Sequence, residues 1–463
     1  MADSTGRTAQ EVYGSCAEPG VVVIGAGFAG LAMGIRLKQA GRHDFVILER
    51  AADLGGTWRE NRYPGCACDV PSYLYAYSFA PNPHWSRVYA ERQEIHAYLR
   101  RTARSYGLER HLRFGRDVES LAYDDAARRW LVTTTRGERL RPRVVVCGVG
   151  ALNEPARPDL EGLAAFRGRT LHTATWDESY DPTGDRVAVI GTGASAVQLV
   201  PAIAGRVARL TVFQRTPTWV LPRPDARVPP VLRRALARTP VALTAVRRLA
   251  YGALEAQALV HPVTARLARR QLRRQVPDAA LRARLTPGTP LAGAGRVPLS
   301  STYLPALVSP RVRVVTDPVR EVRGHTVVDA SGAAHRVDTL VLATGYRPGA
   351  ALARLRISGR HGVRLEEAWA AGPRTHLGIA VPGFPNLFLL FGPGTGVVHG
   401  SNVFMIEQQV EHVLACLRRV EARAGSAIEA ARATAAEGWL WPGSSSGYRR
   451  ATRKSSPYDY TVY

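Results

Sequence analysis

Two separate stretches of the chain show the same succession of apolar and polar positions. In the first, the apolar run VVVI at residues 21–24 precedes an amphipathic stretch to about residue 40 and a second apolar run, FVIL, at residues 45–48. Residues 187–213 repeat this order, from VAVI through an amphipathic stretch to LTVF. Short apolar runs joined through an amphipathic segment are typical of strand, helix, strand units. The pattern therefore predicts an α/β protein that contains two such units.

The segments around these units indicate how the chain is divided. Apolar runs at residues 144–147 and 340–343 each lead into a glycine, which suits a strand that closes each unit. Arginine-rich segments with helical spacing at about 223–290 predict a helical insertion in the second unit. This insertion is interpreted either as a solvated helical face that covers the active-site cleft or as a surface that docks on a membrane. We expect a disordered lead-in at 1–20, a first domain at 21–155 and 355–463 that ends in a helix near 401–423 and an irregular tail, and a second domain at 156–354.

Composition narrows the class of protein. No run of about 18 apolar residues lacks charges, so the sequence predicts no membrane-spanning segment. The net charge of +24 raises nucleic acid as a partner, but nearly all of the 62 basic residues are arginines that spread through the chain. Because they form no single recognition element, we expect no nucleic-acid binding. The polar N-terminal residues lack the apolar core of a signal peptide, which predicts a cytoplasmic protein.

A glycine-rich turn follows the first strand. Gly25, Gly27 and Gly30 form the pattern G-x-G-x-x-G at the start of the expected helix. Such a turn lets the backbone approach a pyrophosphate closely, and the helix N-terminus then faces the phosphates. Glu49 ends the next strand, 24 residues after Gly25, where a carboxylate can accept hydrogen bonds from ribose hydroxyls. These features predict a Rossmann-like domain that binds FAD or NAD.

The second turn has the same context but a different residue at the ribose position. Gly191, Gly193 and Ala196 repeat the pattern, and Arg215 stands where the first unit has an acid. A guanidinium can hold a ribose 2′-phosphate through charge-assisted hydrogen bonds, with Thr216 as a further donor. The sequence thus predicts NADPH here; the alternative is an arginine merely exposed at a strand end. The other residues of this turn expected to contact the cofactor are Thr192, Ala194 and Ser195.

Two longer motifs resemble those of one enzyme family. Residues 166–176, FRGRTLHTATW, match F-x-G-x-x-x-H-x-x-x-W. This resembles the fingerprint of the type I Baeyer–Villiger monooxygenases, class B flavoprotein monooxygenases of the flavin-containing monooxygenase superfamily. Residues 55–69, GGTWRENRYPGCACD, look like the second signature of that family. The segments at 338–346 and 384–396 also look like this family, so the resemblance extends over nearly the whole chain from residue 21.

The resemblance implies a reaction. In the family, NADPH reduces FAD, O2 adds to the flavin as a C4a-peroxyflavin, and one oxygen atom is inserted next to a ketone carbonyl to give an ester or lactone. The implied cofactors are FAD and NADPH, and the implied substrates are O2 and a small-molecule ketone. The nearest alternative is a flavin-containing monooxygenase that oxygenates nitrogen or sulfur of a small molecule. A disulfide reductase would need a redox cysteine pair, and Cys66 and Cys68 have the wrong spacing, so all five cysteines are expected to be free thiols.

The resemblance also implies roles for individual residues. Arg296 lies where the family has its active-site arginine, a group that stabilises negative charge without giving up a proton. Asp69 is expected to orient that guanidinium, or otherwise to cap a turn. His172 and Trp176 belong to the fingerprint and are expected to link cofactor binding to domain movement. Gly295 replaces a lysine that is usual in the family, so the preference for NADPH would depend on the second turn. Positions that match flavin contacts, or core positions for the two aromatic residues, are Thr57, Trp58 and Tyr75.

Overall fold

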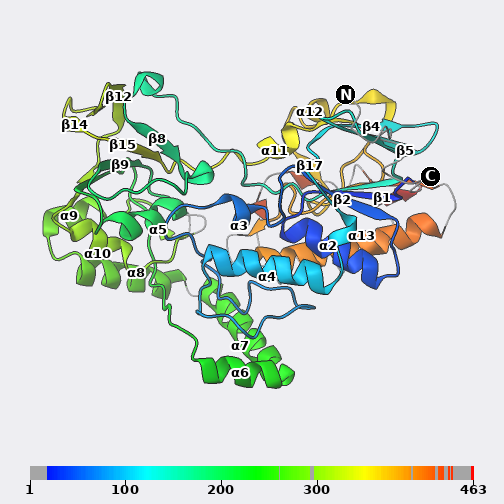
Figure 1. Cartoon of the computed structure of the whole chain (residues 1–463), viewed down its shortest axis with the longest axis horizontal. Helices are drawn as coiled ribbons and strands as arrows, with labels where there is room; N and C mark the ends of the chain where they lie inside the picture. The colour runs from blue at the N-terminus through cyan, green and yellow to red at the C-terminus, as the bar shows by residue number, and fades with distance from the viewer. Residues whose placement is uncertain are drawn as a thin grey trace, which may run out of the picture.

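Two parallel five-stranded sheets form the two halves of the molecule (Figure 1). The structure, a computed structural model, describes residues 18–259, 261–291, 297–397, 400–422, 426–431, 436–437, 440–441 and 460–462. Nearly all of the expected lead-in therefore lies outside the described residues. Both predicted strand, helix, strand units are confirmed, one in each sheet, and the protein has the expected α/β fold.

The first sheet has the strand order β18-β7-β1-β2-β3. Its central strand, β1, pairs in parallel with β2 on one side and with β7 on the other. In these pairings Val23 lies opposite Ile47 and Val146. Parallel strands covered on both faces are apolar throughout, which explains the uninterrupted runs seen in the sequence. The elements of this half are β1 (Val21–Ile24), α2 (Phe28–Gln39), β2 (Phe45–Glu49), α4 (Arg92–Ser105), β3 (Leu112–Phe114), β7 (Val144–Cys147), β18 (Leu387–Leu389) and α13 (Asn402–Glu421).

The second sheet has the strand order β11-β10-β9-β15-β8. The sequence placed its closing strand at residues 340–343, and β15 begins one residue earlier. The paired register of β9 and β15 brings the ends of these strands together at the second glycine-rich turn. The elements of this half are β8 (Arg169–His172), β9 (Arg186–Ile190), α5 (Ala194–Ile203), β10 (Arg209–Phe213), α10 (Tyr303–Val308), β11 (Val312–Val315) and β15 (Thr339–Leu342).

The predicted helical insertion is confirmed between β10 and β11. Figure 1 shows α6 (Pro230–Arg238) and α7 (Pro240–Leu259) projecting from the body, whereas α8 (His261–Gln275) and α9 (Ala279–Arg284) lie close to the second sheet. The insertion also contacts the first half, because Arg247 on α7 donates hydrogen bonds to the carbonyl oxygens of Tyr73 (2.7 Å) and Ala76 (3.2 Å). None of the described helices is both long and apolar enough to cross a bilayer.

Several short strands were not predicted, because their pairing depends on tertiary contacts more than on local pattern. The C-terminal strand is one example: an irregular tail was expected, yet β23 (Tyr460–Val462) pairs antiparallel with β20 (Ile428–Ala430). The Tyr460 hydroxyl also lies 2.6 Å from His412 Nε2 on α13. The remaining elements are α3 (Thr57–Glu60), β4 (Val118–Asp124), β5 (Arg129–Thr134), β6 (Arg139–Leu140), β12 (Val319–Arg323), β13 (Thr326–Asp329), β14 (Ala334–Arg336), α11 (Ala350–Ala353), β16 (Arg356–Ser358), α12 (Leu365–Ala368), β17 (Arg374–Thr375), β19 (Gly396–Val397), β21 (Ala436–Glu437) and β22 (Leu440–Trp441), with 3-10 turns at Glu109–His111, Leu163–Ala165, Thr173–Thr175 and Arg360–Gly362.

Candidate active site

The first glycine-rich turn has a backbone that only glycine accommodates. Gly25 has φ +96°, and a Cβ atom there would lie 2.6 Å from the carbonyl oxygen of Gly148. At Gly30 a Cβ atom would lie 1.8 Å from the carbonyl oxygen of Gly25. A side chain at Gly25 would therefore push the turn away from the segment after β7, and one at Gly30 would push α2 away from the turn. The turn keeps the N-terminus of α2 directly behind the end of β1.

The residues around this turn fit the phosphates and ribose of a dinucleotide. No side chain caps α2 at Gly27, so the amide groups of its first turn are available to a phosphate. The buried Glu49 carboxylate accepts hydrogen bonds from the amides of Ala26 (2.7 Å) and Ala51 (3.0 Å). These bonds fix the carboxylate at the turn, and its remaining lone pairs can accept ribose hydroxyls.

One cavity connects the first turn with the N-terminus of α5 in the second half. Its wall thus combines backbone from the first turn with the start of the helix that follows the second. The candidate residues that line it are Gly25, Gly27, Glu49, Thr57, Trp58, Asp69, Tyr75, Ala194 and Ser195.

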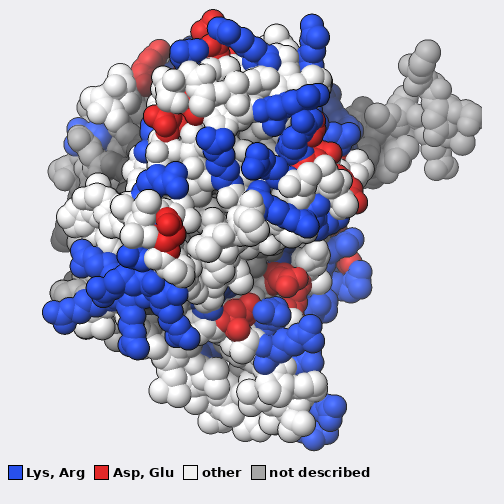
Figure 2. All heavy atoms as spheres, turned by 90° about the vertical axis from the view of Figure 1, so that its left-hand side faces the viewer, with Lys and Arg blue, Asp and Glu red and all other residues white. Residues whose placement is uncertain are grey.

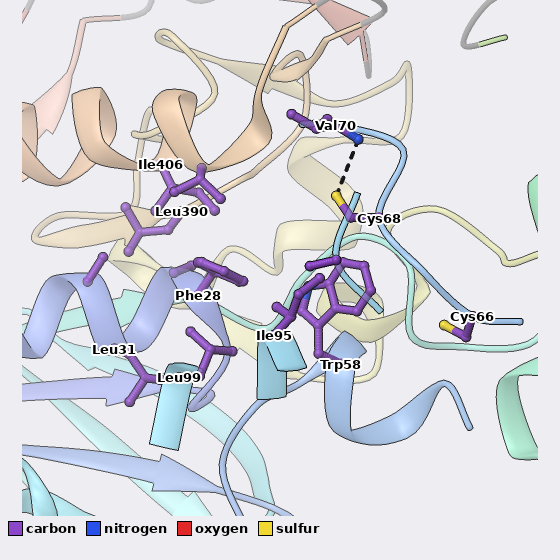
Figure 3. Packing of buried hydrophobic residues seen from close by; sticks show 14 of the residues in the cluster. Phe28, Leu31, Trp58, Cys66, Cys68, Val70, Ile95, Leu99, Leu390 and Ile406 are labelled. Carbon is purple, nitrogen blue, oxygen red and sulfur yellow. Dashed lines mark hydrogen bonds between the residues drawn. The ribbon is translucent and has the colours of Figure 1, made fainter. Parts of the chain in front are cut away.

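Aromatic side chains form one side of this cavity. The indole nitrogen of Trp58 donates to the Tyr75 hydroxyl over 3.2 Å, and the two rings meet edge to face. Phe28 packs edge-on against Tyr75, with ring centroids 5.1 Å apart. Figure 3 shows Phe28 below Leu390 and below Ile406 of α13, with Trp58 to the right of Phe28. Flat apolar walls of this kind suit a planar ring system.

A loop of the first half is held by a residue of the second. Gln198 on α5 accepts a hydrogen bond from the Tyr63 hydroxyl (2.9 Å) and donates one to the carbonyl oxygen of Ala67 (2.9 Å). Asp69 follows two residues later and lines the cavity. The loop that carries Asp69 is therefore fixed to the helix that starts at the second turn. Arg296 and Gly295 lie outside the described residues.

The second turn repeats the geometry of the first. Gly191 has φ +115°, and a Cβ atom there would lie 2.4 Å from the carbonyl oxygen of Ala343. No side chain caps α5 at Gly193, so amides of its first turn are available to a phosphate. Ala196 is fully buried behind this turn, which agrees with a small residue at the third position.

The basic residue predicted to read the ribose phosphate lies beside this turn. The Thr192 hydroxyl donates to the carbonyl oxygen of Thr216 over 3.1 Å, which joins the turn to the segment after β10. Arg215 is exposed there, and within the described part of the chain no carboxylate forms an ion pair with it. Its guanidinium is thus available to an anionic ligand.

His172 and Trp176 do not line the cavity. His172 is buried at the end of β8, where its Nδ1 accepts a hydrogen bond from the Ala174 amide (3.0 Å). Its Nε2 lies 3.4 Å from the Thr344 hydroxyl, which follows β15. Burial lowers the pKa of His172, so the ring is neutral at pH 7. Trp176 is buried edge-on against Tyr180. Both residues therefore belong to the packing of the second half.

The two thiols near the cavity do not form a redox pair. Figure 3 shows the sulfur atoms of Cys66 and Cys68 well apart, and Cys68 Sγ accepts a hydrogen bond from the Val70 amide over 3.3 Å. Burial raises the pKa of Cys66 to about 11, so this thiol stays protonated at neutral pH. Cys66, Cys68, Cys147 and Cys416 are free thiols.

Sequence reasoning missed several residues that line the cavity. Tyr346 donates a hydrogen bond to Asn61 Oδ1 and thereby joins the segment after β15 to the first half. Arg50 forms ion pairs with Glu60 and Glu154, both at 3.2 Å. The only sequence signal for Arg50 was its position directly after Glu49, the acid predicted to bind a ribose. Other lining residues missed in this way are Gln198, Phe391 and Asn402.

The chain is similar in sequence to known oxidoreductases. Residues 22–249 match the family model described as pyridine nucleotide-disulphide oxidoreductase. A Baeyer–Villiger monooxygenase of Streptomyces coelicolor is 41% identical over 96% of this chain and 92% of its own length. Another, of Pseudomonas aeruginosa, is 41% identical over 87% of this chain and 78% of its own length.

Solved structures resemble the whole fold. Cyclohexanone monooxygenase bound to ε-caprolactone superimposes with a TM-score of 0.86 at 28% identity, over 96% of this chain and 99% of that one. Oxidized steroid monooxygenase bound to NADP gives a TM-score of 0.85 at 30% identity, again over 96% and 99% of the two chains. A further neighbour, with a TM-score of 0.86, was solved with FAD and NADP.

Proposed function

Because the chain belongs to the Baeyer–Villiger monooxygenases, flavin-dependent enzymes that use FAD and NADPH, we propose that it converts a small-molecule ketone into an ester or lactone in the cytoplasm. The reaction consumes one ketone, O2, NADPH and a proton, and yields the ester, water and NADP+. The observation that carries the proposal is the cavity that runs from the first glycine-rich turn to the start of α5. It allows two dinucleotides, one at each turn, to meet.

FAD would be held at the first turn. Gly25, Gly27 and Gly30 admit the pyrophosphate at the N-terminus of α2, and Glu49 accepts the ribose hydroxyls. Flavin, once reduced by NADPH, supplies the electrons that activate O2. The residues that would contact its ring system are Thr57, Trp58, Asp69 and Tyr75, which line the same cavity.

NADPH would be held at the second turn. The amides of Ala194 and Ser195 at the start of α5 can bind its pyrophosphate, and Arg215 with Thr216 can bind its 2′-phosphate. The other proposed contacts at this turn are Gly191, Thr192, Gly193 and Ala196. His172 and Trp176 would act through the packing of the second half, since neither faces the cavity.

Two residues are proposed to serve the oxygen-transfer step. The Arg296 guanidinium remains protonated, so it can stabilise negative charge on the reacting oxygen without donating a proton to it. Asp69 would keep that guanidinium oriented, because a carboxylate beside an arginine forms directional charge-assisted hydrogen bonds. The loop that contains Asp69 is itself fixed by Gln198.

The chain is proposed to divide into an FAD domain, residues 21–155 and 355–463, and an NADP domain, residues 156–354, with the insertion at about 223–290. Strand pairing supports this division. In particular, β18 pairs with β7 and β16 pairs with β4, so the segment after residue 355 returns to the first half.

Product analysis tests the proposal. The FAD-loaded protein is incubated with NADPH, O2 and a panel of cyclic and linear ketones, with an aryl methyl sulfide in a parallel reaction. Ester or lactone that carries one atom of 18O from labelled O2 is the expected product. Sulfoxide without any ester would identify a heteroatom monooxygenase instead. NADPH oxidation that yields only hydrogen peroxide would identify an oxidase.

A further inference from the structure

The outward side of α7 is apolar. Residues exposed along this helix recur at the spacing of a single face: Val241, Thr244, Ala245, Arg248, Leu249, Gly252 and Ala253. Val241 is 79% exposed and Leu249 is 74% exposed, whereas Leu243 on the opposite side is buried. A solvated helix normally presents polar residues outward. Among the described residues of this exposed face, Arg248 is the only charged one.

The neighbouring helix also exposes aliphatic residues. α6 contacts α7, and its exposed residues include Val231, at 73% exposure, Leu232 and Ala235. We define the apolar face as Val231, Leu232, Ala235, Val241, Ala245 and Leu249. Isolated exposed aliphatic residues are normal, but a contiguous group on two adjoining helices marks an interaction surface.

The apolar face lies where the molecule projects. α6 and α7 form the lowest part of Figure 1, and Figure 2 shows this part from the side as a mostly white lobe beneath a cluster of Lys and Arg residues. The lobe is held firmly, because Arg247 on the inward side of α7 donates to the carbonyl oxygens of Tyr73 and Ala76. The apolar residues of the outward face are therefore exposed while the helix itself is packed against the protein.

Within the insertion itself, basic residues greatly outnumber acidic ones. Residues 226–277 contain eleven arginines and a single acid, Glu255. On α8, which contacts α7, Arg266, Arg270 and Arg273 share an exposed side with Val263 and Leu267. Arginine next to exposed aliphatic groups can bind phosphate while its stem and neighbours lie in an apolar layer.

We propose that the apolar face of α6 and α7 docks on the surface of an anionic phospholipid bilayer. Aliphatic side chains enter the interface, and the surrounding arginines bind lipid phosphates. A second copy of the chain fits less well, because two such faces would bring arginines of like charge together. Nucleic acid has no apolar region into which the aliphatic side chains could be buried. The inference does not depend on the proposed ketone substrate.

Vesicle flotation tests this docking. The FAD-loaded full chain is mixed with vesicles of phosphatidylcholine and phosphatidylglycerol, or of phosphatidylcholine alone, and the floating fraction is measured. Binding is expected only with the anionic vesicles. It should weaken when ionic strength rises from about 0.1 M to about 1 M, because the Debye length falls from about 10 Å to about 3 Å.

Matched variants separate the two contributions. The double variant Val241→Ser/Leu249→Ser should weaken vesicle binding about tenfold or more, because it removes buried aliphatic area. The double variant Arg234→Glu/Arg248→Glu should weaken it by at least about tenfold. Val363→Ser and Arg101→Glu, both exposed elsewhere, are controls that should leave binding unchanged.

Four results would overturn the proposal. They are failure to bind anionic vesicles, equal binding to neutral vesicles, binding that both double variants retain, and self-association in solution that Val241→Ser/Leu249→Ser abolishes. The last would assign the face to a second copy. Ketone-dependent NADPH oxidation is measured on every variant without vesicles. It should match the unaltered protein, so loss of docking is distinguishable from failure of the proposed reaction.

Discussion

The side-chain amide of Gln198 donates a hydrogen bond of 2.9 Å to the carbonyl oxygen of Ala67, although the two residues lie 131 positions apart. This bond joins the helix that begins at the second glycine-rich turn to the loop that carries Asp69. The Tyr63 hydroxyl donates to the same Gln198 side chain, so one residue of the second half fixes two points of the first.

Replacement of Gln198 should therefore loosen the active-site loop. Gln198→Ala removes these hydrogen bonds, and we expect the free energy of unfolding to fall by about 1–3 kcal/mol. The ratio of ester formed to NADPH consumed should also fall, because Asp69 is held less firmly. Urea unfolding and product quantification measure the two effects. Gln93→Ala, at an exposed site on α4, is the control. An unchanged product ratio would show that Gln198 serves stability alone.

Arg215 should distinguish NADPH from NADH. Arg215→Ala removes a charge-assisted contact to the 2′-phosphate, so the KM for NADPH should rise about 10- to 100-fold while the KM for NADH changes little. Steady-state kinetics with both coenzymes provide the measurement. Arg209→Ala, exposed at the opposite end of β10, should affect neither value. Equal losses with NADPH and NADH would contradict the role.

Arg296 should act after flavin reduction. In Arg296→Ala, anaerobic reduction of bound FAD by NADPH should proceed at the usual rate, whereas ester formation should be lost, because negative charge at the oxygen-transfer step is no longer stabilised. Stopped-flow absorbance and product analysis measure these steps separately. Arg296→Lys is the matched variant, since it keeps the charge but not the planar guanidinium. Full oxygenation by Arg296→Ala would refute the assignment.

His172 should make stability depend on pH. Burial lowers the pKa of His172 below the ordinary 6.5. Well above pH 6.5 the ring is therefore neutral in both the folded and the unfolded chain, and its full contribution to the free energy of unfolding is present. As pH falls below 6.5, the unfolded chain binds a proton that the folded chain does not, and this contribution is lost through the folded pKa. Urea unfolding between about pH 5 and pH 8 should show a steeper decline for the unaltered protein than for His172→Gln. Parallel curves would contradict this expectation.

Buried thiols should be inert. Burial raises the pKa of Cys66 to about 11 and those of Cys147 and Cys416 to about 12. Because the thiolate is the reactive form, these three residues should remain unmodified when the folded, FAD-loaded protein is treated with iodoacetamide at about pH 8. Peptide mass mapping locates any modified residue, and the urea-unfolded protein is the control. Rapid modification of Cys66 in the folded state would contradict its burial.

The two turns illustrate what could be predicted from the sequence. Their glycines meet a local requirement, because φ +96° at Gly25 and φ +115° at Gly191 are backbone angles that other residues rarely adopt. Glu49 and Arg215 follow at fixed offsets, since strand, helix and strand have set lengths. Short-range geometry therefore predicted the fold class and the two turns at which the cofactors are proposed to bind.

Contacts between distant segments were decided only by the tertiary structure. Gln198 gave no sequence signal of its own, and for Tyr346 only the family-like segment that it ends drew attention, because each acts through a partner more than a hundred residues away. The face of α7 is a second case. Apolar residues lie on both of its sides, so periodicity could not say whether Leu243 or Leu249 points outward. The sequence alone determined the two dinucleotide turns, whereas packing between the halves decided which side chains share a cavity and which face solvent, because those contacts depend on the relative placement of elements and not on local propensity.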